Sequence, residues 1–239
     1  VTVTYTIPSL TADNDKVSNA EGALSLQEAV DQAHGTPVTI EKDIRLDEPV
    51  RIAAGQRVEI TANANENYNL FGNKDEKPTN LFVVEEGGEL SLTGALTLGG
   101  WNNTGSILVN HGKTTIDGNV VIEKSTLEGD SMGVIEDNGS SAELILENGT
   151  IQNHKIRGAL SASIRVTEGA SFTMNGGTIQ DNIANTSTGN CAYGGAGGGV
   201  AVMDELPTEE HGTAFTMNGG TISNNTASGY RCSGGGIYS

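Results

Sequence analysis

Hydrophobic positions follow two different periods along this chain. In the first, apolar residues recur at the spacing of one helical face, at Leu26, Ala29, Val30 and Ala33. Ser25 and Glu28 have the spacing of a capping box, and Gly35 stands where a glycine commonly ends a helix. The segment therefore predicts one short amphipathic helix, and no other convincing helical pattern follows it.

From residue 38 onward the period changes to two, which indicates strands. One frame recurs: two apolar residues in alternation, a turn centred on glycine, then two more alternating apolar residues. Regular copies span 50–60, 82–92 and 164–174, a shortened copy spans 107–116, and longer copies span 132–146 and 200–217. The frame glycines are Gly55, Gly87, Gly112, Gly139, Gly169 and Gly212.

A third short apolar piece follows each copy from the second onward. Its members are Leu96 with Leu98, Val120 with Ile122, then Ile151, Ile179 and Ile222. Three strands in a repeat of about 25 residues, with no helix between them, are typical of a parallel β-helix coil. A β-sandwich or propeller is the alternative, but a sandwich predicts Asn-Gly hairpins about every 8–12 residues and no longer period.

This pattern predicts two parts. Residues 1–35 hold an N-terminal strand and the helix, and residues 36–239 form the coils. A coil cannot bury its apolar face alone, so successive coils stack into one interior column. We expect the helix to cover the apolar N-terminal end of that column.

Two stretches are nearly identical, FTMNGGTIQDN at 172–182 and FTMNGGTISNN at 215–225. In the frame, Phe172 should stack on Phe215 and Met174 on Met217, inside the column. Asn175 and Asn218 should form an amide ladder at the following bend. The glycines of that bend should have positive φ, at Gly149, Gly177 and Gly220.

Two further pairs follow in the same stretches, Asp181 with Asn224 and Asn182 with Asn225. We expect these side chains to be exposed and to form ladders as well. A calcium ion among them is a minor alternative, because the repeat-in-toxin calcium motif is absent. The sequence otherwise predicts no metal and no cofactor.

Charge and composition exclude several classes of function. The formal net charge is −17, which repels nucleic acid and leaves no basic footprint for it. No apolar stretch approaches the roughly 20 residues of a membrane span, so we expect no membrane insertion. The first residues lack a signal-peptide pattern, which fits a mature or excised fragment.

Short motifs in the last third resemble a known family. FTMN fits an F-x-x-N motif, and GGGVAV at 197–202 and GGGIYS at 234–239 resemble GGA(I/L/V) motifs. These are similar to repeats of polymorphic outer-membrane proteins and of pectin-lyase-like bacterial surface proteins. GALSLQEAV at 22–30 is similar to the cap segment of such proteins. The resemblance implies an all-β, right-handed parallel β-helix and an extracellular protein of the bacterial surface, commonly an adhesin.

The last motif starts a new coil at Ile237 and stops there, so we expect a C-terminally truncated fragment. Enzymes with this fold include polysaccharide lyases and glycoside hydrolases. Hydrolases of this type need paired carboxylates, and QDN at 180–182, NHG at 110–112 and KIRG at 155–158 match none of their motifs. The four histidines, His34, His111, His154 and His211, are expected to be solvated residues of turns and the helix end.

Binding residues are expected in turns, because β-helices vary most there. The candidates are Tyr68, Trp101, Asn102, Asn103, Tyr193 and Tyr230. Cys191 and Cys232 occupy equivalent turns of successive coils and are a candidate disulfide, which would fit an oxidising extracellular site.

The sequence favours an adhesin or display stalk that binds a host or cell-surface protein or glycan. A polysaccharide lyase or glycoside hydrolase and a purely structural spacer remain as alternatives.

Overall fold

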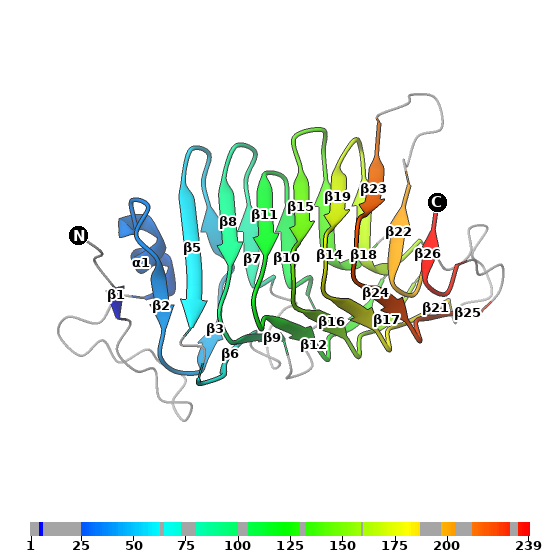
Figure 1. Cartoon of the computed structure of the whole chain (residues 1–239), viewed down its shortest axis with the longest axis horizontal. Coiled ribbons are helices and arrows are strands. Elements are labelled where there is room, and N and C mark those ends of the chain that lie inside the picture. Colours follow the sequence, from blue (N-terminus) through cyan, green and yellow to red (C-terminus); the bar gives the residue numbers. More distant parts are fainter. Residues whose placement is uncertain are drawn as a thin grey trace.

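The computed structural model describes residues 5–6, 25–62, 65–72, 80–99, 105–129, 132–158, 160–186, 197–203, 212–229 and 234–239. The described residues form a right-handed parallel β-helix, and the fold predicted from the sequence is confirmed. Its coils stack side by side along the long axis, from the helix at one end to the last strands at the other (Figure 1). Among the described residues, every strand pair is parallel and joins equivalent positions of successive coils.

The strands of each coil fall into consecutive sheets, named I to IV in the order in which a coil visits them. Sheet I contains β4 (Val50–Ile52), β7 (Phe82–Val84), β10 (Leu108–Asn110), β14 (Gly133–Asn138), β18 (Ala162–Thr167), β22 (Val200–Val202) and β26 (Ile237–Tyr238). Sheet II contains β1 (Tyr5–Thr6), β2 (Val38–Ile40), β5 (Arg57–Ala62), β8 (Glu89–Leu92), β11 (Lys113–Ile116), β15 (Glu143–Leu146), β19 (Ser171–Met174) and β23 (Ala214–Met217).

The other two sheets close the coil. Sheet III contains β3 (Ile44–Leu46), β6 (Tyr68–Gly72), β9 (Leu96–Gly99), β12 (Val121–Glu123), β16 (Thr150–Gln152), β20 (Thr178–Gln180) and β24 (Thr221–Ser223). Sheet IV contains β13 (Thr126–Glu128), β17 (Lys155–Arg157), β21 (Ile183–Thr186) and β25 (Thr226–Gly229). The prediction of three strands per coil is therefore wrong for the later coils, which carry a fourth short strand.

The helix α1 (Leu26–Gln32) lies at the N-terminal end of the column (Figure 1). Its N-terminus has the predicted capping box, in which the Ser25 hydroxyl accepts from the Glu28 N–H and the Glu28 carboxylate accepts from the Ser25 N–H. Its three apolar residues, and Ala33 at its C-cap, are buried in the main core. The helix therefore covers the end of the interior column, as predicted.

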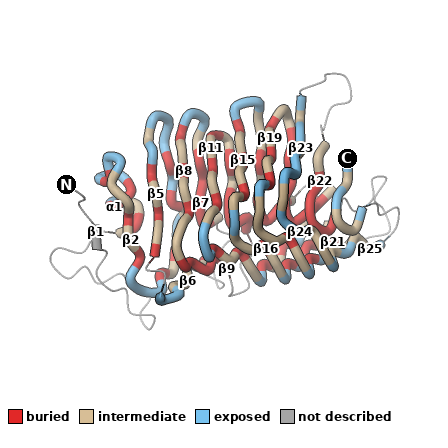
Figure 2. Tube along the Cα trace, viewed as in Figure 1, coloured by how far each residue is buried: buried red, intermediate tan, exposed pale blue. Residues whose placement is uncertain are grey.

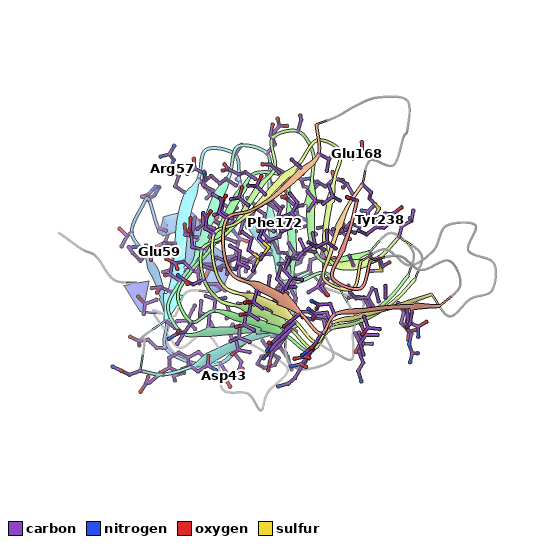
Figure 3. All side chains as sticks on the ribbon, turned by 45° about the vertical axis from the view of Figure 1, so that its right-hand side comes forward. Asp43, Arg57, Glu59, Glu168, Phe172 and Tyr238 are labelled. Carbon is purple, nitrogen blue, oxygen red and sulfur yellow. The ribbon has the colours of Figure 1, made fainter. Side chains whose placement is uncertain are left out.

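Alternating residues point into the column and are buried, which appears as the red bands along the strands in Figure 2. Phe172 lies directly beside Phe215, with ring centroids 4.9 Å apart, and Met174 is paired with Met217. Figure 3 shows Phe172 inside the column and Glu168 on an outer turn. The stacking of the two FTMN stretches is confirmed, and Phe172 and Met174 are buried in the core. In the second copy, Phe215 is half-buried and Met217 is 44% exposed, so its place in the core is not confirmed.

The outer amide ladder is confirmed at the corner between sheets II and III. Asn218 Nδ2 donates to Asn175 Oδ1 over 2.8 Å, and Asn175 Nδ2 donates to Glu147 Oε1 over 3.0 Å. The corner glycines Gly149, Gly177 and Gly220 have φ of 99°, 74° and 85°, which a side chain would strain.

A second ladder runs inside the bend between sheets III and IV, and we call it the bend ladder: Ser125, His154, Asn182 and Asn225. Asn182 and His154 are 0% exposed, so the predictions of an exposed Asn182 and a solvated His154 are wrong. The Asn182 amide donates to Ile151 O and Asn225 Oδ1, at 3.1 and 2.9 Å, and its Oδ1 accepts from the His154 N–H over 3.1 Å.

His154 takes the role of an asparagine in this ladder. Its Nδ1 accepts from the Ser125 N–H over 3.1 Å, so Nε2 carries the proton and donates to Ile122 O over 3.1 Å. Burial lowers the pKa of His154 to about 3, and the ring is neutral in the folded chain. Every polar atom of the ring is satisfied.

Candidate binding site at the shortened turn

The turns between sheets I and II differ in length, and the shortest lies between two longer ones. Residues 85–88 connect β7 to β8 and residues 139–142 connect β14 to β15, whereas only residues 111 and 112 connect β10 to β11. The shortened turn leaves a depression of about 370 Å³ between its neighbours. We call it the His111 notch; its lining is Glu85, Glu86, His111, Asn138, Gly139, Ser140 and Ser141.

Glycine is required at the floor of the notch. A Cβ added to Gly112 would lie 2.3 Å from Gly88 O and 2.5 Å from Glu85 O. The backbone of the short turn is thus pressed against the preceding coil, where the His111 N–H donates to Val84 O over 2.8 Å. A short, tightly held turn fixes the position of the His111 side chain.

The two walls of the notch present different hydrogen-bonding groups, carboxylates on one side and hydroxyls on the other. On one side, Glu85 pairs with Arg51 at 2.8 Å, and Glu86 lies next to it in the chain. On the other side, Ser141 Oγ reaches over the shortened coil to donate to Glu86 Oε1 over 3.0 Å. The walls therefore offer carboxylate acceptors opposite serine hydroxyls.

His111 presents one nitrogen with a lone pair. Its Nδ1 is 3.0 Å from Asn138 O, and because a carbonyl only accepts, Nδ1 carries the proton of the neutral ring. Nε2 is then the basic nitrogen. The arrangement can bind a polar group that donates hydrogen bonds, such as a sugar hydroxyl or an amine, and its carboxylates repel phosphate and uronate groups.

A polar cluster lies directly beneath the notch, on the inward side of the same strands. Asn110 Nδ2 donates to Asp137 Oδ1 over 2.7 Å and to Glu143 O over 3.3 Å, and Thr114 Oγ1 donates to Asn110 Oδ1 over 2.9 Å. Asn110, Thr114 and Asp137 are each 0% exposed. We call these three residues the interior triad.

Asp137 differs from the rest of this interior because it is a carboxyl group in a largely apolar column. Burial raises its pKa to about 7, against the opposing effect of the Asn110 hydrogen bond. Its Oδ2 atom has no hydrogen-bond partner. In the coils on either side, the strand positions paired with Asn110 and Asp137 are Val84 and Val166.

A second depression, of about 440 Å³, lies at the corner between sheets II and III. Its lining is Gly118, Asn119, Val120, Val121, Asn148, Gly149 and Thr150. The nearby Asp117 already accepts from Asn148 Nδ2 over 2.8 Å and from the Gly118 N–H over 2.7 Å. These hydrogen bonds lower the pKa of Asp117 and occupy its carboxylate.

The structure places one of the predicted binding residues. Tyr68 lies in strand β6, not in a loop, and is half-buried against the core. Its hydroxyl donates to the Glu66 carboxylate, which raises the pKa of Tyr68. Trp101, Asn102, Asn103, Tyr193, Tyr230, Cys191 and Cys232 lie outside the described residues.

Sequence reasoning did not select the notch residues. The shortened frame copy at 107–116, between two longer turns, was the signal that could have found them. Of the histidines, His34 is exposed and His111 is half-buried in its turn, while His211 lies outside the described residues.

No protein-family model, curated protein or solved structure matches this chain. Within the described ranges, no set of three or more His, Cys, Asp or Glu side chains is arranged to hold a metal ion. Helix α1 has seven residues, and no helix in the part of the chain that the structure describes is long and apolar enough to cross a membrane.

Proposed function

We propose that this chain is a binding region of an extracellular bacterial surface protein, an adhesin or display stalk, and that the His111 notch is its ligand site. The observation that carries the proposal is the shortened turn itself, since it hollows the edge of an otherwise regular column. The rigid coils on both sides hold the notch residues in fixed positions, as binding sites on turns require.

The chemistry of the notch favours a glycan bearing hydroxyl or amine groups. Glu86 and the Nε2 atom of His111 accept hydrogen bonds, and the hydroxyls of Ser140 and Ser141 both donate and accept. Anionic polysaccharides are disfavoured by the two carboxylates and by the net charge of −17. Asp137, whose pKa is raised as that of a general acid would be, is closed off from any substrate at 0% exposure.

A glycan array, together with an array of host surface proteins, tests this proposal. We expect a ligand whose affinity falls at least about tenfold in the double variant Glu86→Gln/His111→Gln, which corresponds to about 1.4 kcal/mol. Glu48→Gln removes the same charge at an exposed position away from the notch and should bind as the unaltered chain does.

Two outcomes would contradict the proposal. Absence of any ligand on both arrays would favour a structural spacer. Release of sugars from a panel of polysaccharides would favour the lyase or hydrolase alternative.

A further inference from the structure

The interior triad brings together three groups that can react with one another. A hydroxyl, a primary carboxamide and a carboxyl group lie in a chain of hydrogen bonds: Thr114 Oγ1 to Asn110 Oδ1 at 2.9 Å, and Asn110 Nδ2 to Asp137 Oδ1 at 2.7 Å. The hydroxyl and the amide flank the two-residue turn, so they are held together by the backbone as well. These hydrogen bonds hold the hydroxyl beside the amide group that it would attack, and groups held together in this way gain a large effective concentration.

We propose that Thr114 and Asn110 form an intramolecular ester, with release of ammonia, and that Asp137 transfers the proton. Thr114 Oγ1 attacks Asn110 Cγ, and the Oγ1–Cγ bond forms as the carbonyl electrons move to Oδ1. The tetrahedral centre then collapses, the Cγ–Nδ2 bond breaks, and the nitrogen departs as ammonia with a proton from Asp137, which the proton of the hydroxyl replaces. No oxidant or other reactant is consumed.

Asp137 is suited to carry that proton. It contacts the leaving nitrogen, and its second oxygen, Oδ2, has no other partner and is free to hold a proton. As the hydroxyl oxygen attacks, its proton passes to Asn110 Oδ1, to which it already donates. The Asp137 carboxyl gives its proton to the pyramidal nitrogen that it contacts and takes up the Oδ1 proton as the carbonyl forms again, so the carboxyl group ends unchanged. A pKa near 7 lets one group act as both acid and base near neutral pH.

Burial favours the ester once it has formed. All three side chains are 0% exposed, so water cannot readily hydrolyse the product. Ammonia that leaves the column is diluted into solvent and does not return. The bond would join the ends of β10 and β11 and close covalently the turn that forms the floor of the His111 notch, whatever ligand the notch binds.

The inference is tested by the intact mass of the folded chain and by peptide mapping. We expect a mass lower than that of the sequence by one ammonia, located in the peptide that spans Asn110 to Thr114, with no fragment ions between those residues. Hydroxylamine, which cleaves esters but not amides, should open the link and leave a hydroxamate at Asn110.

Variants separate the ester from other losses of ammonia. Thr114→Val and Asp137→Asn should keep the full mass, while Thr114→Ser, which retains the hydroxyl, and Thr115→Val, on the outward side of the same strand, should show the loss. Circular dichroism confirms which variants have folded, and Thr114→Ser keeps the test available if another variant does not fold.

Three results would overturn the proposal. The first is a folded chain at full mass. The second is a loss of ammonia that persists in Thr114→Val, because a succinimide made by the His111 backbone nitrogen has the same mass as the ester. The third is a loss that persists in Asp137→Asn, because the proton transfer assigned to Asp137 would then be wrong.

Discussion

The bend ladder and the interior triad are both buried polar clusters, yet they differ in the kind of atom that lacks a hydrogen-bond partner. In the bend ladder, each side-chain nitrogen and oxygen of His154 and Asn182 has a partner at 2.9 to 3.1 Å, and the atom without one is the neutral hydroxyl oxygen of Ser125. In the interior triad, the atom without a partner is a carboxyl oxygen, Asp137 Oδ2. A satisfied buried network stabilises one structure, whereas an unsatisfied buried carboxyl costs free energy and is available for chemistry.

The histidine in the bend ladder makes the same kind of hydrogen bond to the backbone as the asparagines of the next coils. Asn182 and Asn225 each donate one amide N–H to a strand carbonyl of the preceding coil, Ile151 O and Ile179 O. His154 does the same to Ile122 O with its Nε2–H. The neutral ring thus reproduces an asparagine amide, and His154→Asn should preserve the ladder at pH 7 with a change of about 1 kcal/mol or less in unfolding free energy.

The largest expected effect comes from the opposite titrations of Asp137 and His154. The unfolded Asp137 carboxyl titrates near a pKa of about 3.9, and the folded one near 7. Between these values the folded chain holds a proton that the unfolded chain lacks, so this contribution to stability falls as the pH rises. The unfolded His154 imidazole titrates near a pKa of about 6.5, and the folded one near 3. Its contribution to stability therefore falls as the pH falls through that window.

Two variants separate these contributions. Relative to the unaltered chain, Asp137→Asn should gain about 1.4 kcal/mol per pH unit from about pH 4 to pH 7, or about 4 kcal/mol in total. His154→Asn should gain at a similar rate as the pH falls from about 6.5 to 3. Denaturant unfolding across this range measures both slopes, and burial, the main cause of the Asp137 shift, persists with or without the ester. A variant whose profile runs parallel to that of the unaltered chain would disprove the assigned pKa.

Removing an amide from the bend ladder should have the next largest effect. Asn182→Ala leaves the His154 N–H without its partner inside the column and removes the amide that donates to Ile151 O and Asn225 Oδ1. A buried unsatisfied group costs about 1–3 kcal/mol and each lost hydrogen bond about 1 kcal/mol, so the free energy of unfolding should fall by about 3 kcal/mol or more. Asn185→Ala, in strand β21 of the same coil, is the control and should change it by about 0.5 kcal/mol or less. Equal losses in the two variants would show that the ladder does not stabilise the bend.

The sequence predicted the column of apolar residues, but it did not predict sheet IV or the buried polar clusters, and the reasons are physical. The glycine frame fixed which of Phe172, Met174 and their partners point inward, because strand periodicity leaves only one register that buries them. Sheet IV was not predicted because its first strands each bury a single apolar residue between polar neighbours, Leu127 in β13 and Ile156 in β17. One apolar residue among polar ones does not reveal a strand.

The burial of His154 was not predicted for a related reason. A histidine among polar residues near a glycine frame resembles a turn residue, and nothing in its own neighbourhood indicates burial. Its alignment with Asn182 and Asn225 in successive coils carries the information, since only a ladder needs a hydrogen-bonding side chain at the same place in each coil. The notch was likewise readable as a difference between copies, and neither site was visible in one copy alone.

The smallest expected effect compares two asparagines that differ mainly in burial. Asn218 donates to Asn175 as Asn182 donates to Asn225, over 2.8 and 2.9 Å, but Asn218 is exposed and Asn182 is 0% exposed. Because water replaces the lost partner at the surface, Asn218→Ala should lower the free energy of unfolding by about 0.5 kcal/mol, a small fraction of the Asn182→Ala loss. Denaturant unfolding of the two variants side by side measures this ratio. If Asn218→Ala proved as costly as Asn182→Ala, the ladders would stabilise the coils through register and not through the satisfaction of buried groups, and the contrast with the interior triad would lose its physical basis.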